Sequence, residues 1–180
     1  GGPVSRLINS TTMTVDAVID VGEWYVSEGG HDGASRAQFE HAAGMVLGRK
    51  TYEGLAAYWS PLDGPWADMI NPMPKFVASR TLAGSLEWNA TVIEGDAADG
   101  VAKLKKELDG DLFLIGCGEL ARTLAVSGLI DEYRFWVHPS VQGAGTRPFQ
   151  GEETVRLQLV DAKAFESGVT LLRYEPAAGR

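Results

Sequence analysis

A glycine-rich turn joins a buried strand to a helix in the second half of the chain. Four apolar residues, Leu112 to Ile115, precede Gly116-Cys117-Gly118, and a helical pattern with Leu120 and Leu124 one turn apart follows. The first backbone N–H groups of such a helix lack intrahelical partners and lie at the positive end of its dipole, and glycines let a ligand approach the backbone closely. The turn therefore has the properties of a phosphate or pyrophosphate site, and an ordinary tight turn is the alternative.

The spacing of this turn also matches a dinucleotide-binding fingerprint. Gly116, Gly118 and Ala121 occupy the positions of G-x-G-x-x-A. The fingerprint also requires an acidic residue about twenty positions on, after a second strand, and Asp131 and Glu132 come too early. A different nucleotide-binding fold must therefore be considered.

A second unit of strand, glycine and helix occurs earlier in the chain. Met45–Leu47 is a candidate buried strand, Gly48 ends it, and Arg49–Ser60 has a helical pattern. Lys75–Ser79 is another strand candidate. Ligands of open α/β sheets bind at the carboxyl ends of strands, so we expect one site where these two strands and the strand before Gly116 end.

The remaining elements predict a mixed sheet that can hold these turns. Further strands are expected at Val4–Asn9, Thr14–Ile19, Thr91–Ile93 and Glu132–His138. Helices are expected at about Ala34–Ala43 and after Asp96, and a long loop at Asp20–Ser35. Val155–Phe165 and Val169–Tyr174 would form a closing hairpin. Strands that first alternate with helices and then follow one another indicate a mixed sheet with helices on both faces.

Composition and charge fit one globular domain over residues 1–180, with 44% apolar and 22% charged residues. The net charge of -8 argues against nucleic acid or an anionic membrane surface as the main partner. Cys117 has no second cysteine to pair with, and no apolar stretch is long enough to span a bilayer, so we expect a cytoplasmic protein. Because His31, His41 and His138 are scattered, no metal site is predicted.

Three segments together resemble the dihydrofolate reductase-like superfamily, in the branch of the C-terminal reductase domain of bacterial riboflavin biosynthesis. They are LGRKTYEGLAAYW from Leu47, LFLIGCGELARTLAVSGLIDEYRFWVHPSVQGAGTRPF from Leu112, and TVDAVI from Thr14. The resemblance implies an α/β fold of three layers, with a mixed, mostly parallel sheet of about eight strands, helices on both faces and a C-terminal β-hairpin. The zinc-binding cysteines and histidine of the accompanying deaminase domain are not found, so a stand-alone reductase domain is expected.

The resemblance also implies NADPH as the cofactor. Arg49 and Thr51 would add a guanidinium and a hydroxyl to the phosphate site at a helix N-terminus, and Ser79-Arg80-Thr81 resembles the segment that holds the 2′-phosphate. Solvated side chains are the alternative for Lys50 and Arg80, and a deazaflavin in place of NADPH stays open. The expected cofactor-binding residues are Thr12 and Ile19 beside the nicotinamide, and Gly48, Arg49, Lys50, Thr51, Ser79, Arg80, Thr81, Gly116, Cys117, Gly118, Glu119 and Leu120.

The chain departs from the family pattern at several positions. Cys117 replaces the middle glycine of the family's triplet, and we expect a small buried side chain there rather than a nucleophile, because no base is close in sequence. Ala17 stands where the family usually has glycine. The carboxylate that folate reductases carry after the loop has no clean match: Asp32 is the first candidate for a proton donor, and an exposed loop aspartate is its alternative. The other candidates are Asp16, Glu23, Glu28 and Glu40.

The substrate side is expected to include Asp16, Trp24 and Trp136. If Asp32 is the acid, the Trp24-Tyr25 loop should screen it from water and raise its pKa. Trp136 occupies a position that faces the pterin in folate reductases and is not bulky there, so we do not expect folate as the substrate.

Two functions follow from this interpretation. The first is hydride transfer from NADPH to a C=N or C=O bond of a small heterocycle, pterin-like or ribosylamino-pyrimidine-like. The alternative is a nucleotide or small-molecule binding protein without productive chemistry. The resemblance and the aromatic C-terminal strands also predict a homodimer.

Overall fold

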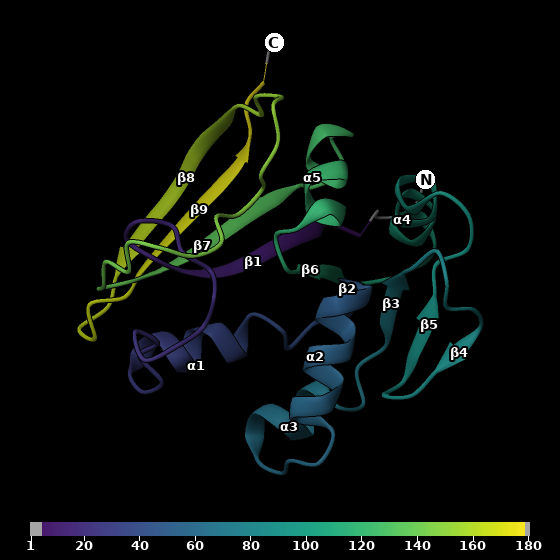
Figure 1. Cartoon of the computed structure of the whole chain (residues 1–180), viewed down its shortest axis with the longest axis horizontal. Coiled ribbons are helices and arrows are strands. Elements are labelled where there is room, and N and C mark those ends of the chain that lie inside the picture. Colours follow the sequence, from purple (N-terminus) through teal and green to yellow (C-terminus); the bar gives the residue numbers. More distant parts are fainter. Residues whose placement is uncertain (1–4, 179–180) are drawn as a thin grey trace.

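A nine-stranded mixed sheet runs through residues 5–178, the part of the chain that the computed structural model describes (Figure 1). The strand order is β4-β5-β3-β2-β6-β1-β7-β9-β8. The central strands pair in parallel, whereas β4 with β5, β7 with β9 and β8 with β9 are antiparallel. The strands are β1 Leu7–Thr14, β2 Ala42–Gly48, β3 Lys75–Ala78, β4 Ser85–Leu86, β5 Ala90–Val92, β6 Asp111–Ile115, β7 Glu132–His138, β8 Leu157–Ala164 and β9 Thr170–Pro176.

Five helices cover the two faces of the sheet within the same residues, which makes three layers (Figure 1). They are α1 Gly30–Ala37, α2 Arg49–Trp59, α3 Pro65–Ile70, α4 Ala97–Glu107 and α5 Glu119–Val126. The helices α1, α2 and α3 lie on one face, and α4 and α5 lie on the other. None of the helices in this part of the chain combines the length and the apolar character needed to cross a bilayer.

The strand β6 shows why a central strand can carry a continuous apolar run. Its side chains alternate between the two faces. Leu112 and Leu114 pack into the core under α4 and α5, together with Leu124, while Phe113 packs into the core under α2, together with Tyr52. A strand buried on both faces reads as a continuous apolar run, so the four-residue run before Gly116 was a reliable signal.

The N-terminal region differs from the prediction of two short strands. A single strand, β1, spans Leu7–Thr14, and residues 15–19 are not a strand; Val4 lies outside the described residues. The chain turns after Thr14, whose Oγ1 accepts a hydrogen bond from the backbone N–H of Val18 at 2.9 Å. Ala17 has φ +60°, in the left-handed region that favours glycine. This turn explains why a glycine suits position 17.

The first helix begins earlier than predicted and includes Asp32 in its first turn. The buried side chain of His31 fixes this start. Its Nδ1 lies 2.8 Å from Ser167 Oγ, and its Nε2 lies 2.8 Å from the carbonyl oxygen of Val26. Because Ser167 belongs to the turn of the C-terminal hairpin, a contact between distant parts of the sequence holds the start of α1. Local sequence periodicity does not contain that information.

A buried lysine fixes the short helix α3 against β3. Lys75 is fully buried, and its Nζ donates hydrogen bonds to the carbonyl oxygens of Ile70 at 2.6 Å and Asn71 at 2.8 Å. The same nitrogen lies 3.8 Å from the centre of the Trp88 ring. The charge therefore interacts with the negative end of α3 and with an aromatic face, which offsets part of the cost of its burial.

Candidate functional site

A cleft of about 980 Å³ opens at the carboxyl ends of β2, β3 and β6. The strands β2 and β6 are parallel neighbours, but the chain leaves them toward opposite faces of the sheet. The helix α2 follows β2 and packs with Tyr52 on one face, and α5 follows β6 and packs with Leu124 on the other. Neighbouring strands whose helices diverge in this way leave a crevice, and such crevices are the usual ligand sites of open α/β sheets.

Two helices start at this cleft without a side-chain cap. The N-cap residues of α2 and α5 are Gly48 and Gly118, and neither has a side chain to bond the free backbone N–H groups. The nearby helix α4 differs, because the Asp96 side chain accepts a hydrogen bond from the backbone N–H of Asp99 at 3.0 Å. The N-termini of α2 and α5 therefore keep donors and positive dipole ends that an anion can use.

The two turns before these helices are packed against each other. Gly116 has φ +102°, and a Cβ atom at this position would lie 2.9 Å from Thr51 Oγ1 on α2. Any larger residue would push the β6–α5 turn away from the first turn of α2. Gly116 is therefore required both by its backbone conformation and by this close approach, and the two turns form one continuous wall of the cleft.

Cys117 points away from the cleft into the protein. Its Sγ lies 2.7 Å from Thr11 Oγ1, whose own hydroxyl donates to Asn9 Oδ1 at 2.6 Å. Burial raises the pKa of the Cys117 thiol to about 11. The thiol therefore stays protonated at neutral pH, which argues against a nucleophilic role.

Asn9, on β1, holds the β6–α5 turn through hydrogen bonds, a role that sequence reasoning missed. It is fully buried on β1, and its Nδ2 donates hydrogen bonds to the carbonyl oxygens of Leu114 and Gly116, each at 3.1 Å. Its position directly after Leu7 and Ile8 in a strand candidate was the available signal, because an amide that is buried must find partners. Here the partners are the end of β6 and the first residue of the turn.

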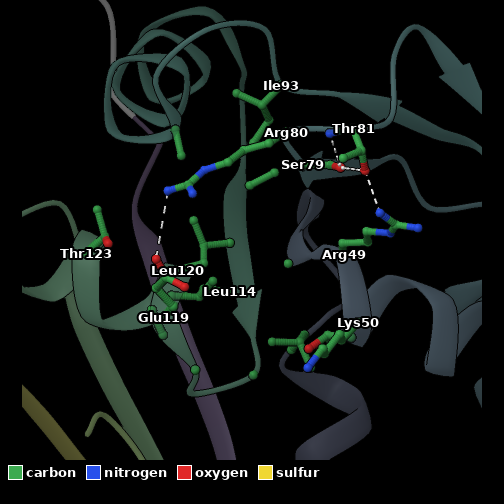
Figure 2. Close-up of a pocket in the computed structure, with 18 of the residues that line it drawn as sticks. Arg49, Lys50, Ser79, Arg80, Thr81, Ile93, Leu114, Glu119, Leu120 and Thr123 are labelled. Carbon is green, nitrogen blue, oxygen red and sulfur yellow. Dashed lines mark hydrogen bonds and ion pairs between the residues drawn. The ribbon is translucent and has the colours of Figure 1, made fainter. Parts of the chain in front are cut away.

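The side of the cleft formed by the end of β3 and the first residue of α2 presents hydroxyl and guanidinium groups. Arg49 donates from Nε to Glu53 Oε1 at 2.8 Å and from Nη1 to Thr81 Oγ1 at 2.5 Å. Ser79 Oγ accepts hydrogen bonds from the backbone N–H groups of Thr81 at 3.2 Å and Leu82 at 3.1 Å. Arg49, Ser79 and Thr81 are thereby brought together at the end of β3 and the start of α2 (Figure 2).

The side chain of Arg80 does not join Arg49, Ser79 and Thr81 (Figure 2). Its side chain extends across the cleft toward the start of α5, where its Nη2 lies 4.0 Å from Glu119 Oε1 (Figure 2). Both side chains are highly exposed, at 95% and 89%. The residues predicted to bind the cofactor that line the cleft are Gly48, Arg49, Lys50, Thr51, Ser79, Arg80, Thr81, Gly116, Gly118, Glu119 and Leu120.

Several lining residues were not predicted. The cleft also includes apolar side chains at the ends of β3, β5 and β6, the start of α4, and Thr146. Thr146 accepts a hydrogen bond through its carbonyl oxygen from the backbone N–H of Ile19 at 3.0 Å. Ile19 itself and Thr12, both predicted beside the nicotinamide, do not line the cleft. Ile19 lies next to its edge, and Thr12 is half-buried on β1 opposite Trp136.

On the predicted substrate side, Asp16 is occupied by the protein itself. Its Oδ1 accepts hydrogen bonds from Thr14 Oγ1 at 2.6 Å and from the backbone N–H of Gln142 at 3.0 Å, and its Oδ2 accepts one from Gly143 N–H at 2.7 Å. These hydrogen bonds, with Thr14 first, hold the pKa of Asp16 well below its usual range. Such a carboxylate does not suit proton donation.

Asp32 is half-buried beside α3 and accepts a hydrogen bond on Oδ1 from Trp66 Nε1 at 3.2 Å. Burial, and then the negative charge of Asp32, raise the pKa of the Tyr25 hydroxyl. The Trp24 ring is buried edge-on against His138 with centroids 5.4 Å apart, and its Nε1 donates to the carbonyl oxygen of Asp20 at 2.8 Å.

Trp136 lies on the α1 face of the sheet and is almost completely buried. Its Nε1 donates to Ser10 Oγ at 3.0 Å, and its ring stacks on Phe165 with centroids 6.2 Å apart. Gln38 Nε2 donates to the same Ser10 oxygen at 3.1 Å. Trp136 is therefore held between β1 and the hairpin, away from the cleft.

Two buried histidines attach the 20–29 loop to the end of β7. The backbone N–H of Val26 donates to His138 Nδ1 at 3.1 Å, and the Val26 carbonyl oxygen contacts His31 Nε2. Burial, followed by the nearby charge of His31, lowers the pKa of His138 to about 4. Among residues 5–178, no group of three or more His, Cys, Asp and Glu side chains is arranged to hold a metal ion.

Comparison with known proteins identifies the family of this chain. The sequence model of the family described as the RibD C-terminal domain matches residues 6–171. The chain belongs to the RibD C-terminal domain family. A Bacillus subtilis relative in the comparison, named uncharacterized protein YyaP, is 29% identical over 136 residues, which are 72% of this chain and 72% of that protein.

Solved structures share the RibD C-terminal domain fold. The structure of a putative riboflavin biosynthesis protein from Shewanella sp. PV-4 superimposes with a TM-score of 0.77 at 21% identity, covering 96% of this chain and 99% of that one. A Thermotoga maritima diaminohydroxyphosphoribosylaminopyrimidine deaminase/5-amino-6-(5-phosphoribosylamino)uracil reductase gives a TM-score of 0.69 at 12% identity, with 97% of this chain but 57% of that one covered. The dihydrofolate reductase-like fold predicted from the sequence is therefore confirmed, with nine strands within residues 5–178 where about eight were expected.

Proposed function

We propose that the protein is an NADPH-dependent reductase that delivers a hydride to a C=N or C=O bond of a small heterocyclic substrate, pterin-like or ribosylamino-pyrimidine-like. One observation carries the proposal: the N-termini of α2 and α5, both without side-chain caps, converge on a cleft that also holds Arg49, Ser79 and Thr81. Membership of the RibD C-terminal domain family supports reductase chemistry. The uracil reductase named in the Thermotoga maritima structure supports a substrate of this class.

The chemistry of the cleft fits both phosphate groups of NADPH. Backbone N–H groups at the starts of α2 and α5 would bind the pyrophosphate, because they point at the cleft from the positive ends of two helix dipoles. Arg49, Ser79, Arg80 and Thr81 would bind the 2′-phosphate, because a dianion is best met by guanidinium and hydroxyl donors together. This local cluster of donors lies in a chain with a net charge of -8, so it is not part of a general basic surface.

Bound NADPH would supply the hydride, and the protein would orient both reactants and exclude water. We assign Thr12 and Ile19 to the nicotinamide end of the site, and Asp32 to proton delivery. The hydrogen bond from Trp66 Nε1 orients the Asp32 carboxyl at the start of α1. Asp16 instead fixes the loop that carries Gln142 and Gly143. A cytoplasmic location fits the use of NADPH.

A second function is a nucleotide-binding protein that lacks productive chemistry. The observation that favours it is that Asp16 is engaged by backbone N–H groups, while Asp32 and Trp136 lie outside the cleft lining. The two functions share the cofactor cleft and differ only in turnover.

The test combines a binding measurement with an activity measurement. NADPH binding is measured from the fluorescence of the reduced nicotinamide, and NADPH oxidation is followed by absorbance with a panel of pterins, ribosylamino-pyrimidines and quinoid compounds. We expect binding, and substrate-dependent oxidation with at least one member of the panel. Binding without oxidation would favour the second function. If NADPH does not bind, a reduced deazaflavin is tested in the same assays, and failure of both cofactors would contradict the proposed cleft.

A further inference from the structure

Two arginines that flank the cleft have different acidic partners. Arg49 is held between Glu53, at 2.8 Å in an i,i+4 pair, and Thr81, at 2.5 Å. Its guanidinium therefore already lies beside the hydroxyls at the end of β3. Arg80 lies between Ser79 and Thr81 in the sequence, but its guanidinium reaches the other wall of the cleft, where it pairs with Glu119 at 4.0 Å (Figure 2).

This arrangement has a consequence for cofactor choice, and the inference rests on the proposed NADPH function. We propose that Glu119 competes with the 2′-phosphate of NADPH for Arg80, and so sets how strongly the protein prefers NADPH to NADH. Arg80 has to leave Glu119 before it can join Arg49 and the Ser79 and Thr81 hydroxyls around a phosphate. NADH has no 2′-phosphate and leaves the Arg80–Glu119 pair intact. Glu119 therefore weakens the binding of one cofactor more than the other.

The strength of the pair suits a competitor. The two side chains are 95% and 89% exposed, and such ion pairs contribute little because water and salt screen them. A phosphate dianion forms stronger, charge-assisted hydrogen bonds with an arginine, so it displaces Glu119. The carboxylate reduces the gain from that exchange without preventing it.

The position of Glu119 adds an effect on both cofactors. Glu119 is the first residue of α5, where a negative side chain interacts favourably with the helix dipole. A pyrophosphate bound at the same helix end would be repelled by this carboxylate, whichever cofactor carries it. Removing the charge should therefore tighten the binding of both cofactors. The additional gain in affinity for NADPH, beyond the gain for NADH, measures the competition for Arg80.

The experiment measures dissociation constants of NADPH and NADH, from nicotinamide fluorescence, for the wild type, Glu119→Gln, Arg80→Ala and the double variant. Glu107→Gln is the matched control. Glu107 also forms an exposed ion pair, with Lys103 at 3.9 Å, but this pair lies within one helix and Glu107 does not line the cleft. Glu119→Gln should raise the ratio of the NADH to the NADPH dissociation constant by about two- to fivefold at low salt. This gain should shrink as salt is added, and Glu107→Gln should leave the ratio unchanged.

The double variant identifies the cause. If Glu119 acts through Arg80, Glu119→Gln should not change the ratio when Arg80 is already alanine. A ratio that rises equally in both backgrounds, or that stays constant while both affinities change together, would overturn the competition and leave the proposed function intact. Weaker NADPH binding by Glu119→Gln would also overturn it, because Glu119 would then support the binding of NADPH and would not oppose it. A wild type that binds neither cofactor would overturn this inference together with the NADPH assignment.

Discussion

The carboxylate of Asp16 binds the backbone of Gly143, with 2.7 Å between Oδ2 and the amide nitrogen. This hydrogen bond and the one to Gln142 attach the loop of residues 142–146 to the turn that follows β1. The same loop reaches the cleft at Thr146. The same hydrogen bonds keep the Asp16 pKa below its usual range, so the carboxylate stays ionised at neutral and mildly acidic pH.

Replacing Asp16 with Asn should release this loop. The amide keeps one acceptor oxygen but loses the charge and the second acceptor, so hydrogen exchange at the Gln142 and Gly143 amides should become faster. In the wild type, their protection should persist from neutral pH down to about 3.8, the ordinary pKa of an aspartate, and decline only below it, because the folded-state pKa is lowered. Asp63→Asn, on another exposed loop, is the control. Unchanged exchange in Asp16→Asn would show that other contacts hold the loop.

Replacing Arg80 with Ala should weaken NADPH binding by about 1.5 to 3 kcal/mol, the range for a charge-assisted hydrogen bond. NADH binding should change little, because the missing contact is to the 2′-phosphate. Titration with both cofactors measures the two effects, and Lys103→Ala on the exposed side of α4 serves as the control. Equal losses for NADPH and NADH would contradict a 2′-phosphate role for Arg80.

Asp32→Asn tests the proposed proton donor once a substrate is found. Turnover should fall by about two orders of magnitude or more, while the NADPH dissociation constant should stay within about twofold, because general acid catalysis is lost and the cofactor cleft is untouched. Asp68→Asn, on the exposed side of α3, should keep both values. Wild-type turnover in Asp32→Asn would rule out this carboxyl as the donor.

Acid should destabilise the fold through His138. Its pKa is lowered from 6.5 to about 4 by burial and by the charge of His31, so the unfolded chain binds the proton more readily. The contribution of His138 to stability is present above pH 6.5 and is lost as the pH falls toward 4, by roughly 3 kcal/mol in total.

Urea unfolding between pH 4 and 7 measures this effect. His138→Asn keeps an acceptor for the Val26 N–H but cannot titrate, so its stability should depend less steeply on pH, although lost packing lowers it overall. His41→Asn, at an exposed position, should keep the wild-type slope. The same slope in all three proteins would exclude His138 as the source.

We also propose that the protein forms a homodimer through the C-terminal hairpin. The strand β8 is an edge of the sheet, and its Leu159 and Val160 remain 54% and 46% exposed. Light scattering at micromolar concentration should give the mass of a dimer, and Leu159→Asp should shift it to a monomer. Val126→Asp, an exposed apolar position on α5, should not. A monomeric wild type would contradict the proposal.

The cleft could be located from the sequence because its signals are local. The run before Gly116 is buried on both faces, and the glycines fall where a strand must turn sharply into a helix. The helix after Asp96 was likewise predicted, because the N-cap that Asp96 provides depends on only the next few residues. Such features are encoded within about ten residues.

The features that the sequence did not predict depend on distant contacts. The start of α1 involves a contact between His31 and Ser167, and Arg80 reaches Glu119 across the cleft. The burial of Trp24 depends on His138. Each pair joins residues from separate elements, so periodicity within one element carries no trace of it.

The place of β1 in the sheet also affects how the chain must be made. Among the strands of residues 5–178, Leu7–Thr14 comes first in the sequence, yet it lies between β6 and β7, and its Asn9 binds Leu114, 105 positions later. During translation, a strand that is largely buried in the folded protein therefore waits with two unpaired edges until β6 and β7 have emerged. Such a segment is a natural binding site for a chaperone, and closing the centre of the sheet is a late and slow step.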